Sequence, residues 1–395
     1  MFAKKTVEDF NFKSQRALVR VDFNVPIHEG KINDDTRIRE SLPTIQKILK
    51  DGGSVVLMSH LGRPKGKVVD SMRLKPVAVR LGELIDRSVL ALPDCVGADV
   101  EREIFSLKPG AVALLENLRF HAEEEKNDAS FAKSLAKLGT VYVNDAFGTA
   151  HRAHASTAGV ADHLKPRLAG YLMKKEIDFL GRLLANPARP FVAVFGGAKV
   201  SSKIPILKNL MGKIDKLLIG GGMAYTFAAA KGGQVGKSLC EREFLDEARA
   251  ILAEAQKRSV HVFLPTDTRT VTDVEMPDTL KIFPVDCIPD DREGVDIGPE
   301  TIKSFSQALG DAKTIFWNGP LGMFEHPAFS EGTFSFAKAF ANSSAVKVVG
   351  GGDVVSAVLK SGVADKVDHI STGGGAAMEF LEGIDLPGLA ALDNA

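Results

Sequence analysis

Short runs of β-branched and other apolar residues alternate with helical patterns along the whole chain. This alternation is typical of β–α–β units, in which parallel strands are connected by helices that cover the sheet. We expect strands near 17–21, 54–58, 111–115 and 140–143 in the first half, and near 191–195, 216–219, 261–264, 314–317 and 345–349 in the second half. The sequence therefore predicts an α/β protein built on parallel sheets.

A chain of 395 residues is long for a single hydrophobic core, so two domains are expected. A helical pattern over 170–184 lies between the two sets of strands, and the Asn-Pro and Arg-Pro pairs at 186–187 and 189–190 follow it as helix breakers. We predict a first domain at 1–170, a connecting helix at 171–185 and a second domain at 186–380. The tail, 381–395, is expected to pack back on the first domain.

Composition excludes several classes of protein. Lysine plus arginine equals aspartate plus glutamate at 50 each, so the chain offers no overall positive charge for nucleic acid or anionic lipid. No stretch approaches the ~18 apolar residues of a membrane span, and the N-terminus lacks an export signal. The three cysteines, Cys95, Cys240 and Cys287, are far apart, which argues against disulfides and a structural zinc site. A cytoplasmic enzyme without membrane or nucleic-acid partners fits best.

In the first half, the strand ends are rich in arginine and histidine, within the motifs RVDFNVP, SHLGRP, ENLRF and NDAFGTAHRAH. Ligands of parallel sheets bind beyond the carboxyl ends of the strands. Asp22 and Asn24 alone are typical of a turn after a strand. Several cations at one sheet edge repel one another unless an anion binds between them. The cations Arg37, His60, Arg63, Arg119 and Arg152 therefore predict a site for a small polyanion, whereas His28, His121 and His163 are interpreted as surface residues.

In the second half, the strand ends carry glycine-rich loops instead: FGGAKVSSK, IGGGMA, WNGPLGMFE, VGGGD and STGGGA. Glycine loops that open helices suit nucleotide phosphates, which accept hydrogen bonds from backbone N–H groups at the positive helix end. Lys199 and Lys203 are spaced to share one face of a helix beginning beside the glycines of FGGAK. Asp353, after three glycines, is placed to hold Mg²⁺ together with phosphate oxygens. Two anion sites of different kinds predict phosphoryl transfer.

Two other interpretations are weaker. The segment 232–238 resembles a nucleotide P-loop, but Lys231 stands where the first glycine is required and no predicted strand precedes it. An NAD-dependent dehydrogenase needs a G-x-G-x-x-G fingerprint, which is absent, and leaves the arginines without a role. A nucleic-acid binder is disfavoured by the zero net charge, the single tryptophan and the three tyrosines.

Taken together, the motifs from RVDFNVP to STGGGA and the LPGLAAL tail resemble the phosphoglycerate kinase family, in the family's order and over nearly the whole chain. The resemblance implies reversible Mg²⁺-dependent phosphoryl transfer between 1,3-bisphosphoglycerate and ADP, giving 3-phosphoglycerate and ATP, in glycolysis. It also implies a monomer with two Rossmann-like lobes, joined by a hinge helix and separated by a ligand cleft. The first lobe would bind the triose phosphate and the second the magnesium nucleotide.

The resemblance also assigns residues to three roles. It places the acidic-substrate site on Asp22, Asn24, Arg37, His60, Leu61, Gly62, Arg63, Arg119 and Arg152. It places the nucleotide site on Gly197, Lys199, Lys203, Gly220, Asn318, Glu325, Gly351, Gly352, Asp353 and Val354. Within that site, Glu325 would hold the ribose and Asp353 the metal. The transferring group would be stabilised by Arg37, Lys203 and the backbone amides of Gly373, Gly374 and Gly375.

Two stretches depart from the family pattern. The loop 287–299 lacks an aromatic residue before its DIGP turn, and Val354 stands where the family usually carries serine or threonine. A valine side chain cannot donate to a phosphate, but its backbone N–H can. We expect activity to survive, and the sequence alone predicts that a threonine at this position tightens Mg-ADP binding or raises kcat.

Overall fold

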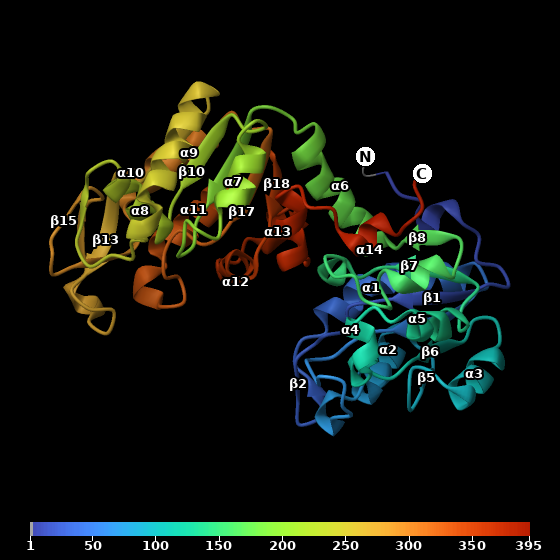
Figure 1. Cartoon of the computed structure of the whole chain (residues 1–395). Helices are drawn as coiled ribbons and strands as arrows, with labels where there is room; N and C mark the ends of the chain where they lie inside the picture. Colours follow the sequence, from blue (N-terminus) through green and yellow to red (C-terminus); the bar gives the residue numbers. More distant parts are fainter. Residues whose placement is uncertain (1–2) are drawn as a thin grey trace. The chain divides into compact units, whose positions relative to one another are not determined.

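The computed structural model describes residues 3–395, which form two compact units. The N unit runs to Asp178 and includes the C-terminal segment Asp385–Ala395, and the C unit is Phe179–Ile384. Each is a parallel sheet lying among its helices (Figure 1). Among the described residues, none of the helices combines the length and apolar character needed to cross a membrane.

Helix α6 (Tyr171–Ala185) contributes to both units. The backbone N–H groups of its first three residues donate to Thr44 Oγ1 and to Asp145 Oδ1, at 2.8 to 3.2 Å. These bonds tie the first turn to the N unit. The sequence predicts the whole helix, 171–185, as a connection between domains, whereas the contacts divide it after Asp178.

The C-terminal segment Asp385–Ala395, with helix α14 (Pro387–Ala390), packs on the N unit. Gly388 N donates to Ala150 O at 2.8 Å, and Arg167 Nε forms an ion pair with Asp393 Oδ1 at 2.8 Å. The contacts therefore place the start of this return at Asp385, four residues after the start predicted from the sequence.

The N unit has a six-stranded parallel sheet in the order β5-β6-β4-β1-β7-β8. Its strands are β1 (Arg16–Arg20), β4 (Ser54–Met58), β5 (Val89–Ala91), β6 (Val112–Leu114), β7 (Val141–Asn144) and β8 (Arg167–Ala169). Its helices are α1 (Thr36–Lys50), α2 (Lys75–Ile85), α3 (Ala98–Phe105), α4 (Ala122–Glu125) and α5 (Ala129–Ala136). Strand β4 is buried along its whole length, as expected of a central strand covered on both faces. A short hairpin, β2 (Ile27–His28) and β3 (Lys31–Ile32), follows β1.

The C unit has a second six-stranded parallel sheet, in the order β12-β10-β9-β17-β18-β19. Its strands are β9 (Phe191–Phe195), β10 (Lys216–Ile219), β12 (His261–Phe263), β17 (Thr314–Asn318), β18 (Val346–Val349) and β19 (His369–Ile370). Its helices are α7 (Ile204–Leu210), α8 (Met223–Ala230), α9 (Leu245–Lys257), α10 (Pro299–Ala308), α11 (Glu331–Ala341), α12 (Gly352–Lys360) and α13 (Gly375–Leu381). Trp317 anchors the core, with edge-to-face contacts to Phe336 and Phe340 at 5.0 and 5.3 Å.

The C unit also carries small sheets that the sequence analysis does not anticipate. One is antiparallel, in the order β14-β13-β16, with β13 (Asp267–Val271), β14 (Lys281–Pro284) and β16 (Glu293–Ile297). The other pairs β11 (Gln234–Val235) with β15 (Cys287–Ile288). These strands lack the continuous apolar runs that mark the parallel strands.

The order of the parallel strands locates the ligand edges. Numbered along the chain, the C-unit strands follow the order 3-2-1-4-5-6, which is that of the Rossmann fold. The order reverses between β9 and β17, and in the N unit between β1 and β7. Ligands of such sheets bind beyond the strand ends at the reversal, so ligand sites are expected at the loops after β1, β7, β9 and β17.

Candidate active-site residues

The loops after β1 and β4 meet because the two strands are paired in register, Arg20 opposite Met58. Arg37, at the start of α1, forms an ion pair with Asp22, with 2.6 Å between NH1 and Oδ2. Asn24 Oδ1 accepts a hydrogen bond from Gly62 N at 2.9 Å. His60 Nδ1 lies 3.9 Å from Asp22 Oδ1. The structure thus brings five predicted residues, from RVDFNVP, SHLGRP and the start of α1, to one edge of the sheet.

Arg119 joins this edge from the loop after β6. Its NH1 donates to Gly62 O at 2.8 Å, and its side chain is buried beside Glu125. Asn117 fastens the two loops together, because its Nδ2 donates to Leu61 O at 2.8 Å and its Oδ1 accepts from Leu61 N. Burial lowers the pKa of Arg119, with Glu125 acting in the opposite direction. The Leu61 side chain is buried in the core, so this residue offers the site only its backbone.

The remaining predicted residues of the N unit are more exposed. Arg63 and Arg152 both have exposed side chains, and Arg152 Nε donates to His151 Nε2 at 3.1 Å. The charge of Arg152 lowers the pKa of buried His154 and that of Arg119, so it lies within electrostatic reach of the cluster. Arg37 and Arg119 are therefore held in place by hydrogen bonds within the protein, whereas the side chains of Arg63 and Arg152 are exposed to solvent.

His60 is buried, and burial followed by the charges of Arg20, Arg119 and Arg37 lowers its pKa well below the usual value. A neutral imidazole follows at physiological pH. The ring therefore contributes a hydrogen-bonding group to the cluster and not a positive charge. This differs from the sequence analysis, which counts His60 among the cations.

Of the histidines expected at the surface, His28 and His163 are exposed, whereas His121 is half-buried. Its Nε2 lies 2.7 Å from Asp94 Oδ1, and its ring packs on Phe131 with 5.2 Å between ring centroids. Cys95 completes a group whose ligand-type atoms lie within 4.8 Å of one another. Hydrogen bonds from His121 and Cys95 N already satisfy Asp94 Oδ1, so the group needs no metal.

In the C unit, the loop after β9 lies directly against the loop after β17. Gly196 N donates to Asn318 O and Gly197 N to Pro320 O, both at 2.8 Å. A side chain at position 196 is excluded, because its Cβ would lie 2.1 Å from Pro320 O. Gly220, at the end of β10, donates to Phe195 O at 2.8 Å. Three predicted nucleotide positions, 197, 220 and 318, thus meet at the point where the strand order reverses.

The two lysines of this loop lie differently from the prediction of one helical face. Helix α7 begins at Ile204, so Lys199 lies in the preceding turn and Lys203 caps the helix. Lys199 is exposed, whereas Lys203 is partly buried. Burial lowers the pKa of Lys203, and the charges of Asp353 and Glu382 act in the opposite direction. Lys203 therefore lies within electrostatic reach of Asp353, the predicted magnesium ligand.

Asn318 holds the loop that begins α12. Its Nδ2 donates to Gly350 O, and its Oδ1 is buried without a hydrogen-bond partner among the described residues. Gly351 caps α12 with φ of 110°, and a Cβ there would lie 2.7 Å from Asn318 Nδ2. Gly352 and Asp353 are exposed in the first turn. Asn318 therefore has an unused acceptor, and α12 has free first-turn amides, as any helix N-terminus does.

Val354 turns away from this edge. Its side chain is fully buried in the apolar cluster that contains Trp317 and Val358. Only its backbone is available to a ligand. Glu325 is exposed in the loop after β17.

The three glycines before α13 are not equivalent. Gly373 N donates to Ser371 Oγ at 3.2 Å, so this amide is engaged within the loop. Gly374 and Gly375 are exposed, and Gly374 has φ of 52°. Of the three predicted amides, the last two are therefore the ones open to a ligand.

The sequence analysis does not identify Glu241, which holds the loop between β9 and α7 that carries Lys199 and Lys203 (the lysine loop). Glu241 accepts hydrogen bonds from Ser201 N at 3.0 Å and from Ser201 Oγ at 2.6 Å, between the two lysines. Its own N–H donates to Thr226 Oγ1 of α8 at 3.0 Å. Ser201 and Glu241 are 40 residues apart in the sequence, and no motif connects them.

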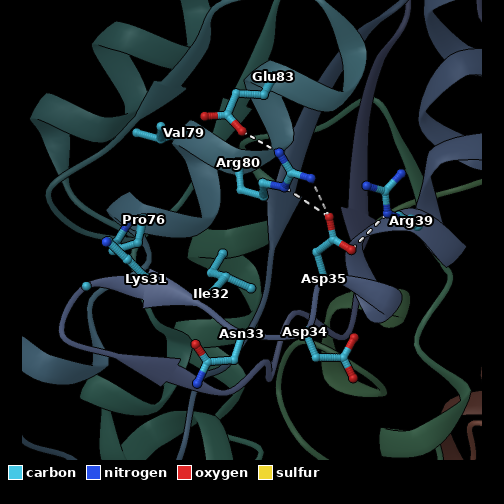
Figure 2. A pocket seen from close by; sticks show the side chains of 11 residues that line it. Lys31, Ile32, Asn33, Asp34, Asp35, Arg39, Pro76, Val79, Arg80 and Glu83 are labelled. Atoms are coloured by element: carbon cyan, nitrogen blue, oxygen red, sulfur yellow. Dashed lines mark hydrogen bonds and ion pairs between the residues drawn. The ribbon is translucent and has the colours of Figure 1, made fainter.

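A surface cavity of about 590 Å³ lies elsewhere on the N unit, lined by β3, the start of α1 and α2. Figure 2 shows that its two arginines face carboxylates: Arg80 contacts both Asp35 and Glu83, and Arg39 contacts Asp35. None of the predicted site residues lines it. Each of its two arginines contacts a carboxylate, and no phosphate-binding motif predicted from the sequence contributes to its lining, so we assign it no ligand.

Comparison with known proteins gives a consistent result. Residues 7–384 match the family described as phosphoglycerate kinase. Two curated relatives with that name, from Chloroherpeton thalassium and Dictyoglomus turgidum, are 53% and 54% identical over 99% of this chain and the whole of theirs. The solved phosphoglycerate kinases of Coxiella burnetii and Pyrococcus horikoshii OT3 superpose with TM-scores of 0.91 and 0.81, at 40% and 34% identity, each over 98% of both chains.

Proposed function

Because the chain belongs to the phosphoglycerate kinase family, we propose that it transfers a phosphoryl group between 1,3-bisphosphoglycerate and ADP, giving 3-phosphoglycerate and ATP. The matching relatives are phosphotransferases, and the NAD-dependent dehydrogenase has no support among them. The observation that carries the proposal is the cluster of Arg37, His60 and Arg119 at one sheet edge, since its two guanidinium groups supply the charge that a triose phosphate requires and its neutral imidazole supplies a hydrogen-bonding group.

We assign the acidic substrate to the N unit. Arg37 is oriented by Asp22 and Arg119 by the Gly62 carbonyl, so both guanidinium groups are held before a substrate arrives. A planar guanidinium binds carboxylate or phosphate through two parallel hydrogen bonds. The exposed Arg63 and Arg152 are proposed to complete the site on binding. In the direction of ATP use, the acceptor is a carboxylate already ionised at neutral pH, so the reaction requires no general base.

We assign the nucleotide to the C unit, at the loops after β9, β10, β17 and β18. Lys203 and the open amides of Gly374 and Gly375 are proposed to neutralise the transferring group, and Glu325 to contact the ribose. Asp353 would hold Mg²⁺. Its exposed carboxylate at the start of α12, near Lys203, suits a metal that is usually bound by one or two carboxylates together with phosphates. Bound there, the ion would neutralise phosphate charge during transfer.

Three further points belong to the same proposal. Transfer requires the two substrates to meet, so we propose that the hinge predicted from the sequence closes during each turnover. We propose that the protein acts as a monomer. We also place it in the cytoplasm, and all three cysteines are free, as a reducing compartment requires.

A coupled assay tests the proposal. Product formation should require ATP, 3-phosphoglycerate and Mg²⁺ together. Arg37→Ala should lower kcat by roughly 10²–10³, the usual effect of losing one donor to a developing charge. Arg39→Ala, two residues along the same helix and paired with Asp35, is the matched control and should retain normal turnover. Turnover independent of 3-phosphoglycerate would refute the activity, and an equal loss in both variants would refute the role of Arg37.

A further inference from the structure

Directly behind the acidic-substrate cluster lies a carboxylate that the proposed chemistry does not use. Glu124, in α4, is fully buried. Its Oε2 accepts a hydrogen bond from Ser156 N at 2.9 Å, and its Oε1 accepts from Ser156 Oγ at 2.5 Å. A carboxylate without solvent is costly unless a cation balances it.

The cation that acts on it is Arg20, at the end of β1, which is itself 1% exposed: burial raises the pKa of Glu124, and the charge of Arg20 opposes this effect. Its Nε donates to Ser156 Oγ at 2.9 Å, and its NH1 donates to Val21 O. Because the serine oxygen accepts from arginine, the serine proton is free to point at Glu124. Ser156 therefore links the buried guanidinium to the buried carboxyl group through two hydrogen bonds of defined direction.

The same guanidinium reaches the substrate cluster. Arg20 NH2 lies 3.2 Å from Nδ1 of His60. Arginine can only donate, so Nδ1 must be the acceptor and the ring proton must lie on Nε2. The alternative partner, Asp22 Oδ1, lies 3.9 Å from Nδ1, which is beyond a hydrogen bond. His60 is therefore held as the neutral Nε2–H form, with that N–H as its only ring donor.

We infer that Glu124 is a positioning residue for the acidic-substrate site, which acts through Ser156 and Arg20 to fix the tautomer of His60. The inference rests on the proposed function, because it assigns the Nε2–H group to an oxygen of the triose phosphate. The arrangement parallels carboxylates that orient metal-binding histidines from behind, whose loss changes affinity or activity by roughly 10–100-fold.

The decisive variant is Glu124→Gln, which keeps the shape of the side chain and removes its charge. We expect KM for 3-phosphoglycerate to rise by about 10–100-fold while KM for Mg-ATP changes less than about twofold. Glu124→Asp, which retains the charge, should recover part of the loss. Glu123→Gln, exposed on the neighbouring position of α4, is the matched control and should behave as the unaltered protein.

Nitrogen NMR of ¹⁵N-histidine-labelled protein supplies a readout that does not depend on turnover. The signals of His60 are assigned by their absence in His60→Gln. In the unaltered protein they should show a protonated Nε2 and an unprotonated Nδ1. They should shift towards a mixture of tautomers in Glu124→Gln. Ser156→Ala, which cuts the bridge while keeping both charges, should give the same shift. It also provides the test if the glutamine variant does not fold.

The outcomes separate the two hypotheses. A folded Glu124→Gln or Ser156→Ala with unchanged His60 tautomer and unchanged KM for 3-phosphoglycerate overturns the inference. A fall in kcat with both KM values and the tautomer unaltered also overturns it, since that result points to a general structural effect. If the unaltered protein shows no 3-phosphoglycerate-dependent turnover, the proposed function fails, while the tautomer signals still report on the buried bridge.

Discussion

Replacing Val354 with threonine tests whether the side chain at this position, in the first turn of α12, binds phosphate or packs in the core. The sequence alone predicts that the added hydroxyl binds a phosphate and tightens Mg-ADP binding. The structure reverses this expectation, because the side chain of Val354 is fully buried among apolar residues that include Trp317 and Val358. We now expect Val354→Thr to lower stability and leave nucleotide affinity unchanged.

The magnitude follows from the burial. The exchange removes one buried methyl group, worth about 0.8 kcal/mol, and buries a hydroxyl, which costs about 1–3 kcal/mol without a partner. A helical threonine can donate to a carbonyl one turn back, which returns about 0.5–1.5 kcal/mol. The carbonyls within reach, Gly350 O and Gly351 O, already accept hydrogen bonds from Asn318 Nδ2 and Val355 N, so the threonine hydroxyl would have to share an acceptor with one of these donors. We therefore expect a net loss of about 1–3 kcal/mol.

Calorimetry measures both the thermal stability of the variant and its affinity for Mg-ADP. For a unit of this size, each kcal/mol should lower Tm by roughly 2–4 °C. Val358→Thr is the matched control, since Val358 is equally buried on the same helix, one turn further from its start. Both variants should lose similar stability and bind Mg-ADP with normal Kd. Tighter Mg-ADP binding in Val354→Thr alone, without a loss of Tm, would refute the reasoning.

Two further predictions concern residues outside the motifs. Glu241→Ala should free the lysine loop from its two bonds to Ser201 and raise KM for Mg-ATP by about tenfold, with KM for 3-phosphoglycerate unchanged; exposed Glu243→Ala is the control in steady-state kinetics. Burial, with Arg119 and Arg20, lowers the pKa of His154 to about 4. Between pH 6.5 and 4 the unfolded chain therefore binds this proton and the folded chain does not, so stability falls on acidification. Urea unfolding at pH 7 and pH 5 should show a smaller acid loss in His154→Gln, and equal losses would contradict the assignment.

Much of the fold could be predicted because the parallel strands are buried on both faces. Such strands read as short apolar runs, and nine of them were expected close to where β1, β4, β6, β7, β9, β10, β12, β17 and β18 lie. The edge strands β5 and β8 were not expected: two of the three residues of β5 are exposed, and β8 begins with an arginine and has only two apolar residues. The β13 segment (DTRTV) is buried without being apolar, so hydrophobicity does not reveal it.

Only those site residues could be predicted that belong to short motifs at the ends of strands. Cations and glycines at strand ends mark the ligand edges, because the topology of parallel sheets brings those ends together. The residues that support the site from behind, Arg20, Ser156 and Glu124, do not form a motif in the sequence. Arg20 and Ser156 are 136 residues apart, and Ser156 and Glu124 are 32 apart. Their partnership arises from packing, which a single sequence does not show.

The two units use the same kind of sheet edge in different ways, and the difference has a physical reason. In the N unit, arginine side chains held by Asp22 and by Gly62 O supply full charges, which suits a small anion with few atoms to contact. In the C unit, glycine loops pack closely against neighbouring protein atoms, as at Gly196 and Gly351, and open backbone amides such as those of Gly374 and Gly375 would bind the phosphates while a metal shared their charge. Fixed cations are costly to hold without a ligand, so they need buried carboxylates behind them. Glu124 behind Arg20 meets that need, whereas the glycine loops of the C unit require only the hydrogen bonds that hold their backbone in place.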